Sequence, residues 1–111
     1  MSARSSSSAV HSAPIFAALG DATRLRLVSR LCNDGPASIT CLAAGTNITR
    51  QAITKHLHVM EHAGLAHSIR HGRESIWQLN EHRLKEARFY LDQISKRWDD
   101  ALGQLQKFVE H

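Results

Sequence analysis

Between residues 50 and 73 the chain gathers side chains suited to binding a polyanion. This stretch holds Arg50, Lys55, Arg70 and Arg73 against a single carboxylate residue, together with five of the eight histidines. Its local excess of three positive charges accounts for most of the formal net charge of +4. A basic patch favours nucleic acid as a partner, and the partner that we expect is double-stranded DNA.

The polar residues at the start of this stretch recur at helical spacing. At about 100° per residue, one narrow arc carries amide, hydroxyl, ammonium and imidazole groups and no carboxylate. The members of this arc are Gln51, Thr54, Lys55, His58 and His62. Such groups hydrogen-bond to base edges and phosphates in a major groove. We expect Gln51 and Thr54 to meet base edges. Lys55 and His58 should contact phosphates, and Arg50 a phosphate or a guanine.

A second basic group surrounds a glycine turn. Arg70, His71 and Arg73 flank Gly72 between two segments of alternating character, 65–70 and 75–79. The alternation and the turn predict a β-hairpin. Its basic tip would lie along the DNA backbone or enter the adjacent minor groove.

Five helices are expected to position these groups. They run from Pro14 to Gly20, from Asp21 to the break at 33–36, from about Ser38 to Ala44, from Thr49 to Ala63, and from Asn80 nearly to His111. Asp21, Thr49 and Asn80 supply side-chain oxygens for N-caps. Gly64 supplies the stop after the fourth helix.

Apolar spacing indicates which helix faces dock on the core. The inward positions expected for the second helix are Leu25, Val28, Leu31 and Cys32, and those for the fourth are Ile53, His56, Leu57 and Met60. These elements predict a mainly α fold with a small β-hairpin, a winged helix-turn-helix within one domain over 13–111. The Ser-rich segment 1–12 is expected to form a disordered tail.

The last helix carries an apolar stripe longer than one small domain needs. Its members follow each other at alternating steps of three and four residues from Leu84 to Phe108. A chain of 111 residues cannot easily bury both this stripe and the first helix without a second copy. We expect a homodimer, with packing onto the helix's own subunit as the alternative. The expected interface comprises Ile15, Phe16, Leu19, Leu84, Leu91, Ile94, Trp98, Leu105 and Phe108.

The sequence gives less support for a redox, metal-binding or catalytic function. Cys32 and Cys41 lack CxxC spacing, so they are expected to be reduced core residues, with a redox pair as the alternative. His58 and His62 lie one helical turn apart, but no Cys, Asp or Glu nearby completes a zinc site. We predict no metal, no cofactor and no enzymatic activity, because phosphate loops, nucleophile elbows and paired carboxylates are missing from the sequence.

Several segments resemble the ArsR/SmtB-type repressors. The similarity lies in Leu19–Leu27, in Ile53–Leu57 followed by Met60 and Ala63–Leu65, in Arg70–Arg73, and in Trp77–Leu79. It implies a homodimeric winged helix joined by the first and last helices. It also implies a repressor that releases promoter DNA when an inducer, which the sequence does not specify, binds. The resemblance gives His56 a packing role.

The same resemblance argues against metal sensing. The positions of a Cys-x-Cys site are Ser38 and Thr40, and those of a second site near the ends of the last helix are Glu81, Arg83, Ile94 and Arg97. Neither set suits a metal, so the chain resembles a subgroup without the usual sites. The segment from Tyr90 to Glu110 is similar to that subgroup. A non-standard metal or thiol sensor is left as an alternative.

Two further readings of the basic patch stay open. A winged helix could bind an acidic protein, or it could bind DNA without an operator. The sequence shows no apolar run of about 20 residues and no secretory signal, so we expect a cytoplasmic protein that does not contact membranes. A twofold dimer would place two recognition helices about one DNA turn apart and predicts an inverted-repeat operator.

Overall fold

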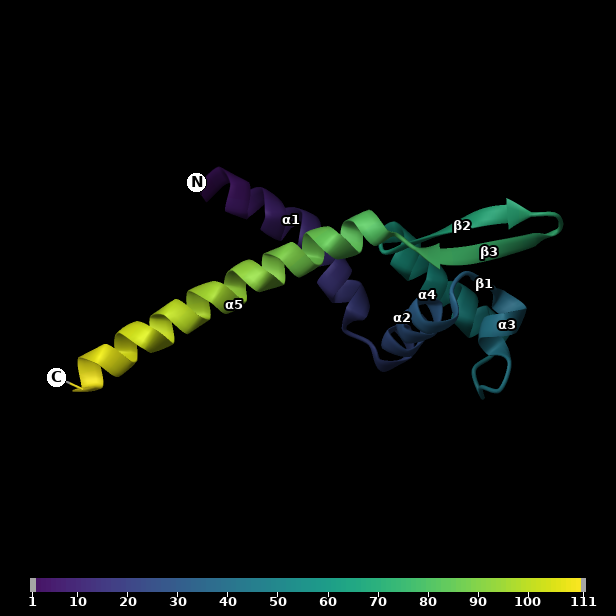
Figure 1. Ribbon diagram of the computed structural model, residues 1–111. Coiled ribbons are helices and arrows are strands. Elements are labelled where there is room, and N and C mark those ends of the chain that lie inside the picture. Colours follow the sequence, from purple (N-terminus) through teal and green to yellow (C-terminus); the bar gives the residue numbers. More distant parts are fainter. Residues whose placement is uncertain (1, 111) are drawn as a thin grey trace.

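A computed structural model describes residues 2–110, and it describes the side chains from residue 10 onward (Figure 1). The elements are α1 (Ser2–Leu19), α2 (Ala22–Asp34), β1 (Ala37–Ser38), α3 (Ile39–Ala43), α4 (Arg50–His62), β2 (Ala66–His71), β3 (Glu74–Leu79) and α5 (Glu81–Glu110). The predicted fold class is confirmed: helices dominate, a small sheet forms the wing, and α3 and α4 form the helix-turn-helix unit. No helix in the described part is long and apolar enough to cross a membrane.

The wing is an antiparallel sheet of three strands in the order β1-β3-β2. In the hairpin, Ala66 pairs with Leu79 and His71 pairs with Glu74. Gly72 takes the first central position of the turn with a φ of 65°, where a two-residue turn needs glycine. β1 was not predicted, because a strand of two residues is too short to show alternation. It pairs Ala37 with Trp77 and so fixes the start of α3 against β3.

The predicted helix caps are confirmed. Asp21 accepts a hydrogen bond from the backbone N–H of Arg24 at 3.0 Å, and Thr49 accepts one from Ala52 at 3.1 Å. The backbone N–H of Arg83 donates to Asn80 at 3.4 Å. After α4 the N–H groups of Gly64 and Leu65 donate to the carbonyls of Glu61 and Met60. This paired arrangement is the Schellman motif, and it turns the chain sharply into β2.

The core lies where α1, α2, α3 and α4 meet the sheet. The inner face of α4 is confirmed: Ile53, Leu57 and Met60 are fully buried, and His56 is half-buried. Leu42 of α3, Leu65 and Trp77 complete this layer. Since the buried side of α4 is fixed, its other side must face away from the protein.

The face of α2 differs from the prediction. Leu27 and Leu31 are buried, whereas Leu25 is 49% exposed and Cys32 is exposed. Apolar residues on α2 cover more than one side, so the spacing alone was compatible with a helix rotated by part of a turn. Cys41 is also exposed, so the expectation that the cysteines fill the core is wrong.

The expectation of a disordered segment over 1–12 also differs from the structure. α1 begins at Ser2 and continues through Pro14, and Ser12 is buried with 1% of its surface exposed. A proline inside a helix removes one backbone hydrogen bond. The helix continues because it packs along α5, where the rings of Phe16 and Tyr90 lie 6.2 Å apart. The composition of residues 1–12 alone could not predict this packing between α1 and α5.

The described chain is strongly elongated. Its radius of gyration is 18.2 Å and its extents are 66 × 30 × 20 Å. A compact domain of this length has a radius of gyration of about 13 Å. Figure 1 shows the reason: α5 runs past the rest of the molecule, and its C-terminal half projects away from the winged helix.

Leu27 and Leu25 offer a matched test of the observed phase of α2. Leu27→Ala should lower the free energy of unfolding by about 2–5 kcal/mol, because it empties a buried site. Leu25→Ala, on the same helix, should cost less than about 1 kcal/mol. Urea unfolding followed by circular dichroism measures both, and a larger loss for Leu25→Ala would contradict the observed phase.

Candidate nucleic-acid interface

The outer side of α4 presents the polar arc to solvent. Arg50, Gln51, Lys55 and His58 are exposed, and Thr54 is half-buried. The Thr54 hydroxyl donates to the carbonyl of Arg50 at 2.8 Å, which leaves its oxygen able to accept a further hydrogen bond. A shallow hollow of about 390 Å³ runs along this side, lined by Ile39, Arg50, Gln51, Thr54 and Lys55. The structure therefore brings four predicted DNA-binding residues onto one surface.

His58 lies toward the sheet side of this surface. Its ring stands edge-on to Trp77 with centroids 5.9 Å apart, and its Nδ1 is 3.4 Å from the Glu61 carboxylate. Both contacts restrain the imidazole without burying it. A phosphate contact by His58 stays a prediction, and it would compete with Glu61.

The wing residues are exposed beside α4. The Arg70 Nε donates to the carbonyl of Gly72 at 3.3 Å, so this side chain helps to hold the turn. Arg73 lines a second hollow of about 170 Å³ together with Arg50. The structure thus brings the tip of the wing close to the start of α4. His71, at the last position of β2, does not line this hollow.

One residue that the sequence analysis did not single out, Arg30, holds α3 in place. The Arg30 guanidinium donates to the carbonyls of Leu42 at 2.8 Å and Cys41 at 3.0 Å. These acceptors lie in the last turn of α3, whose final carbonyls have no helical partner. Arg30 therefore ties α2 to the first helix of the helix-turn-helix unit. Its distance of eleven and twelve residues from its acceptors explains why no local motif indicated this role.

The second expected surface lies on α1 and α5, and only part of it is exposed in the structure. Ile15 is a correction: with 1% of its surface exposed in a single chain, it is a core residue and leaves no area for a partner. Phe16, Leu19 and Leu84 pack partly against the same core. The remaining predicted residues are exposed on α5, namely Leu91, Ile94, Trp98, Leu105 and Phe108.

Comparisons with known proteins agree with this geometry. A helix-turn-helix domain family matches residues 19–69. The chain is 39% identical to the HTH-type transcriptional regulator YuzN of Bacillus subtilis over 77 residues. This match covers 64% of this chain and 84% of YuzN. It is similar to an ArsR-like transcriptional regulator from Rhodococcus, with 31% identity, a TM-score of 0.79 and coverage of 92% and 93% of the two chains. The chain belongs to the ArsR family of transcriptional regulators.

A more distant neighbour shares the fold. It is a winged helix-turn-helix DNA-binding domain from Mycobacterium bovis, described as homodimeric and as a possible ArsR-family regulator. Its identity is 19%, its TM-score is 0.65, and the match covers 91% of this chain and 90% of that one. The relatives and the fold of this ArsR-family chain are those of transcriptional regulators.

The ArsR-type positions considered for metals are occupied by other interactions here. The Ser38 Oγ accepts the backbone N–H of Cys41 at 3.2 Å and so caps α3. The Arg83 guanidinium lies 3.3 Å from the Nδ1 of His11 and 3.7 Å from the Glu86 carboxylate. In the part of the chain that the structure describes, no three His, Cys, Asp or Glu side chains lie close enough together to hold a metal ion.

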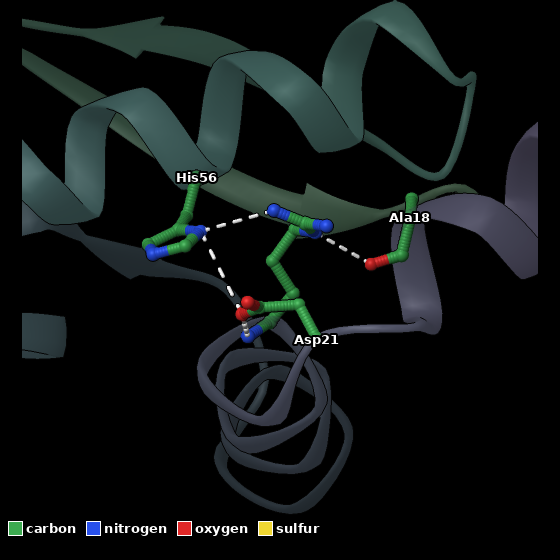
Figure 2. Close-up of polar contacts among 4 residues, drawn as sticks. Ala18, Asp21 and His56 are labelled. Atoms are coloured by element: carbon green, nitrogen blue, oxygen red, sulfur yellow. Dashed lines mark hydrogen bonds and ion pairs between the residues drawn. The ribbon is translucent and has the colours of Figure 1, made fainter.

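A polar cluster joins the start of α2 to α4 (Figure 2). The Arg24 Nε donates to the carbonyl of Ala18 at 2.6 Å, and its Nη1 lies 3.3 Å from the Nδ1 of His56. Because arginine only donates, this contact is a hydrogen bond when Nδ1 of His56 carries no proton. The Asp21 carboxylate lies 3.9 Å from the same Nδ1. His56 therefore does more than pack: it connects α4 to the start of α2, and Arg24 continues this connection to α1.

The cluster also affects the ionisation of Asp21. The hydrogen bond from the backbone N–H of Arg24 is the main cause that lowers the pKa of Asp21 below its ordinary value of 3.8. Partial desolvation opposes this effect, and the nearby charges of Arg24 and His56 add to it. A carboxylate with a lowered pKa stabilises the fold at pH values above its unfolded pKa. That contribution is lost as the pH falls through the folded pKa.

Asp21→Asn tests this charge with little change in shape, because asparagine caps helices about as well as aspartate. The variant should be less stable than the wild type at pH 7, and the two should converge as the pH falls below 3.8. Chemical unfolding at a series of pH values measures the difference. A gap that does not change with pH would show that the charge of Asp21 contributes nothing.

Proposed function

We propose that this ArsR-family regulator is a homodimeric repressor that binds an inverted-repeat operator. The observation that carries the proposal is the exposed polar side of α4, which is fixed by the burial of Ile53, Leu57 and Met60 on the opposite side. A helix exposed in this way enters a major groove and reads base edges from its N-terminal end.

The proposed roles follow position on the surface. Gln51 and Thr54, near the N-terminus of α4, read base edges, while Lys55 and His58 contact phosphates. Arg50 contacts a phosphate or a guanine, and Arg70, His71 and Arg73 bring the wing onto the backbone. The arginines, the lysine and the histidines supply positive charge and donors for phosphates, and Gln51 and Thr54 supply the hydrogen-bonding groups that read base edges.

The dimer is proposed from the exposed side of α5. Leu91, Ile94, Trp98, Leu105 and Phe108 lie along a helix that extends beyond its own domain. Large apolar patches on a single chain mark interaction surfaces. The homodimeric Mycobacterium bovis domain with the same fold supports a second copy as the occupant. Twofold symmetry then requires an operator with two half-sites.

Repression is the proposed outcome of binding. A dimer that spans two major grooves on one DNA face occupies about two helical turns of a promoter, where it excludes the polymerase. The resemblance to the ArsR/SmtB-type repressors implies the same outcome. It also implies an inducer that releases the DNA.

The first experiment separates base reading from phosphate binding. Fragments of the source genome retained by the protein identify a bound duplex, and a scrambled duplex of equal length is the comparison. Gln51→Ala should lower the preference for the bound duplex by about 1–3 kcal/mol. Lys55→Ala, on the same helix, should weaken both duplexes alike. Fluorescence anisotropy at a fixed salt concentration measures each affinity.

The contrary results are distinct. Equal affinity of the wild type for both duplexes would indicate a DNA binder without an operator. Failure to bind either duplex would favour an acidic protein as the partner. Each result would overturn the proposal of a sequence-specific repressor.

A second experiment addresses the dimer. Trp98 is 64% exposed in the single chain, and Trp98→Glu should shift the protein toward monomer because it places a charge in the apolar interface. Lys96→Glu is the control, since Lys96 lies about 200° around the helix from Trp98. Sedimentation velocity at several concentrations measures the shift. An unchanged dimer with Trp98→Glu would exclude this face from the interface.

A further inference from the structure

A small hollow lies where the wing meets the helix-turn-helix unit. Its volume is about 170 Å³, enough for several water molecules at about 30 Å³ each. Seven residues from three places in the sequence line it: Ser38, Ile39, Thr40, Arg50, Arg73, Glu74 and Ser75. It adjoins the hollow on the outer side of α4, because Ile39 and Arg50 line both. It therefore belongs to the surface that faces DNA in the proposed complex.

The short strand β1 builds this hollow. Ser38 pairs with Ile76, so the adjoining residues at the start of β3, Glu74 and Ser75, lie beside the first turn of α3. Packing of α3 on α4 brings Arg50 to the same place. Arg73 follows Gly72 in the hairpin turn and approaches from the wing. The pairing of two residues thus brings Arg50 and Arg73 to the same hollow.

The lining has unused donor capacity. Ser38 accepts a backbone hydrogen bond through its Oγ, which leaves its hydroxyl hydrogen free to donate. Thr40 and Ser75 add two more hydroxyls. Within the described residues, no carboxylate lies at ion-pairing distance from the guanidinium of Arg50 or of Arg73. Two arginines and several hydroxyls around one hollow are the donor set that binds phosphate oxygens.

We propose that this hollow seats one phosphate of the DNA backbone, held from the helix side by Arg50 and from the wing side by Arg73. The proposal rests on the proposed function and specifies it. Arg50 then contacts a phosphate and not a guanine. Arg73 contacts the same phosphate and not the minor groove. The wing and the recognition helix would share one anchor, which fixes the angle at which α4 enters the groove.

Glu74 favours a DNA phosphate over free inorganic phosphate. Glu74 is one of the lining residues, and together with the two arginines it gives the lining a formal charge of a single positive unit. A backbone phosphodiester carries one negative charge. Free phosphate carries more at neutral pH, because its second ionisation is partly complete there. The charge of the hollow therefore matches the phosphate of a polymer better.

The salt dependence of binding tests whether the two arginines share a phosphate. Each neutralised phosphate contributes about 0.9 to the slope of log K against log salt on duplex DNA. If Arg50 and Arg73 hold one phosphate, the double variant Arg50→Ala/Arg73→Ala should lose about 0.9 per subunit, and neither single variant should lose more. If they hold separate phosphates, the losses should add to about 1.8 per subunit.

The probe is a random-sequence duplex of defined length, so no operator is needed. Lys55→Ala/Arg73→Ala is the matched control, since Lys55 lines the other hollow and its loss should add to that of Arg73. Circular dichroism checks the fold of each variant. Additive slopes for the Arg50 and Arg73 pair would overturn the shared site while leaving DNA binding intact. A wild type that does not bind the duplex would instead overturn the proposed function.

A second measurement separates the two sources of phosphate. Side-chain Nε resonances of Arg50 and Arg73 in the DNA-free protein are followed during titration with inorganic phosphate at constant ionic strength. We expect no saturable shift. Saturation would assign the hollow to a free anion and overturn its assignment to the DNA backbone.

Discussion

The interface depends on the burial of one side of α4. Ile53, Leu57 and Met60 lose all contact with solvent, and each such side chain contributes about 1.5–3 kcal/mol by its burial. A rotation of the helix by a quarter turn would expose part of this set and bury polar groups without partners, which is costly. The orientation of Gln51, Thr54 and Lys55 is therefore determined by residues that are buried in the core.

Burial fixes the rotation of α4, but polar contacts fix its neighbours. Arg24 joins the end of α1 to His56 of α4, and Arg30 joins α2 to the last carbonyls of α3. Both arginines belong to α2. Arg24 contacts α4 and Arg30 contacts α3, so each helix of the helix-turn-helix unit is held by one of them. These contacts are directional, because a guanidinium offers donors in a fixed plane, whereas the hydrophobic effect is not.

The features that the sequence predicted correctly are local. Caps at Asp21 and Thr49, the stop at Gly64 and the turn at Gly72 each depend on residues within five positions, and the inner side of α4 depends on helical periodicity alone. The missed features join distant segments. Arg24 and His56 are 32 residues apart, and β1 pairs with a strand almost forty positions later. The early start of α1 belongs to the same group, since α1 packs along α5, which lies far away in the sequence.

The candidate site was predicted as two patches, one on α4 and one on the wing, because the sequence shows charge and periodicity but not distance. The distance between them is set by β1, the least conspicuous element of the chain. Its two residues place the turn of the hairpin beside the start of α4, so Arg50 and Arg73 share a hollow although they are separated by a helix and a strand. A wing displaced by one pairing position would move Arg73 by about 3.3 Å along the strand and turn its neighbours to the other face of the sheet. The register of the wing is therefore as important for the proposed DNA-binding surface as the rotation of α4.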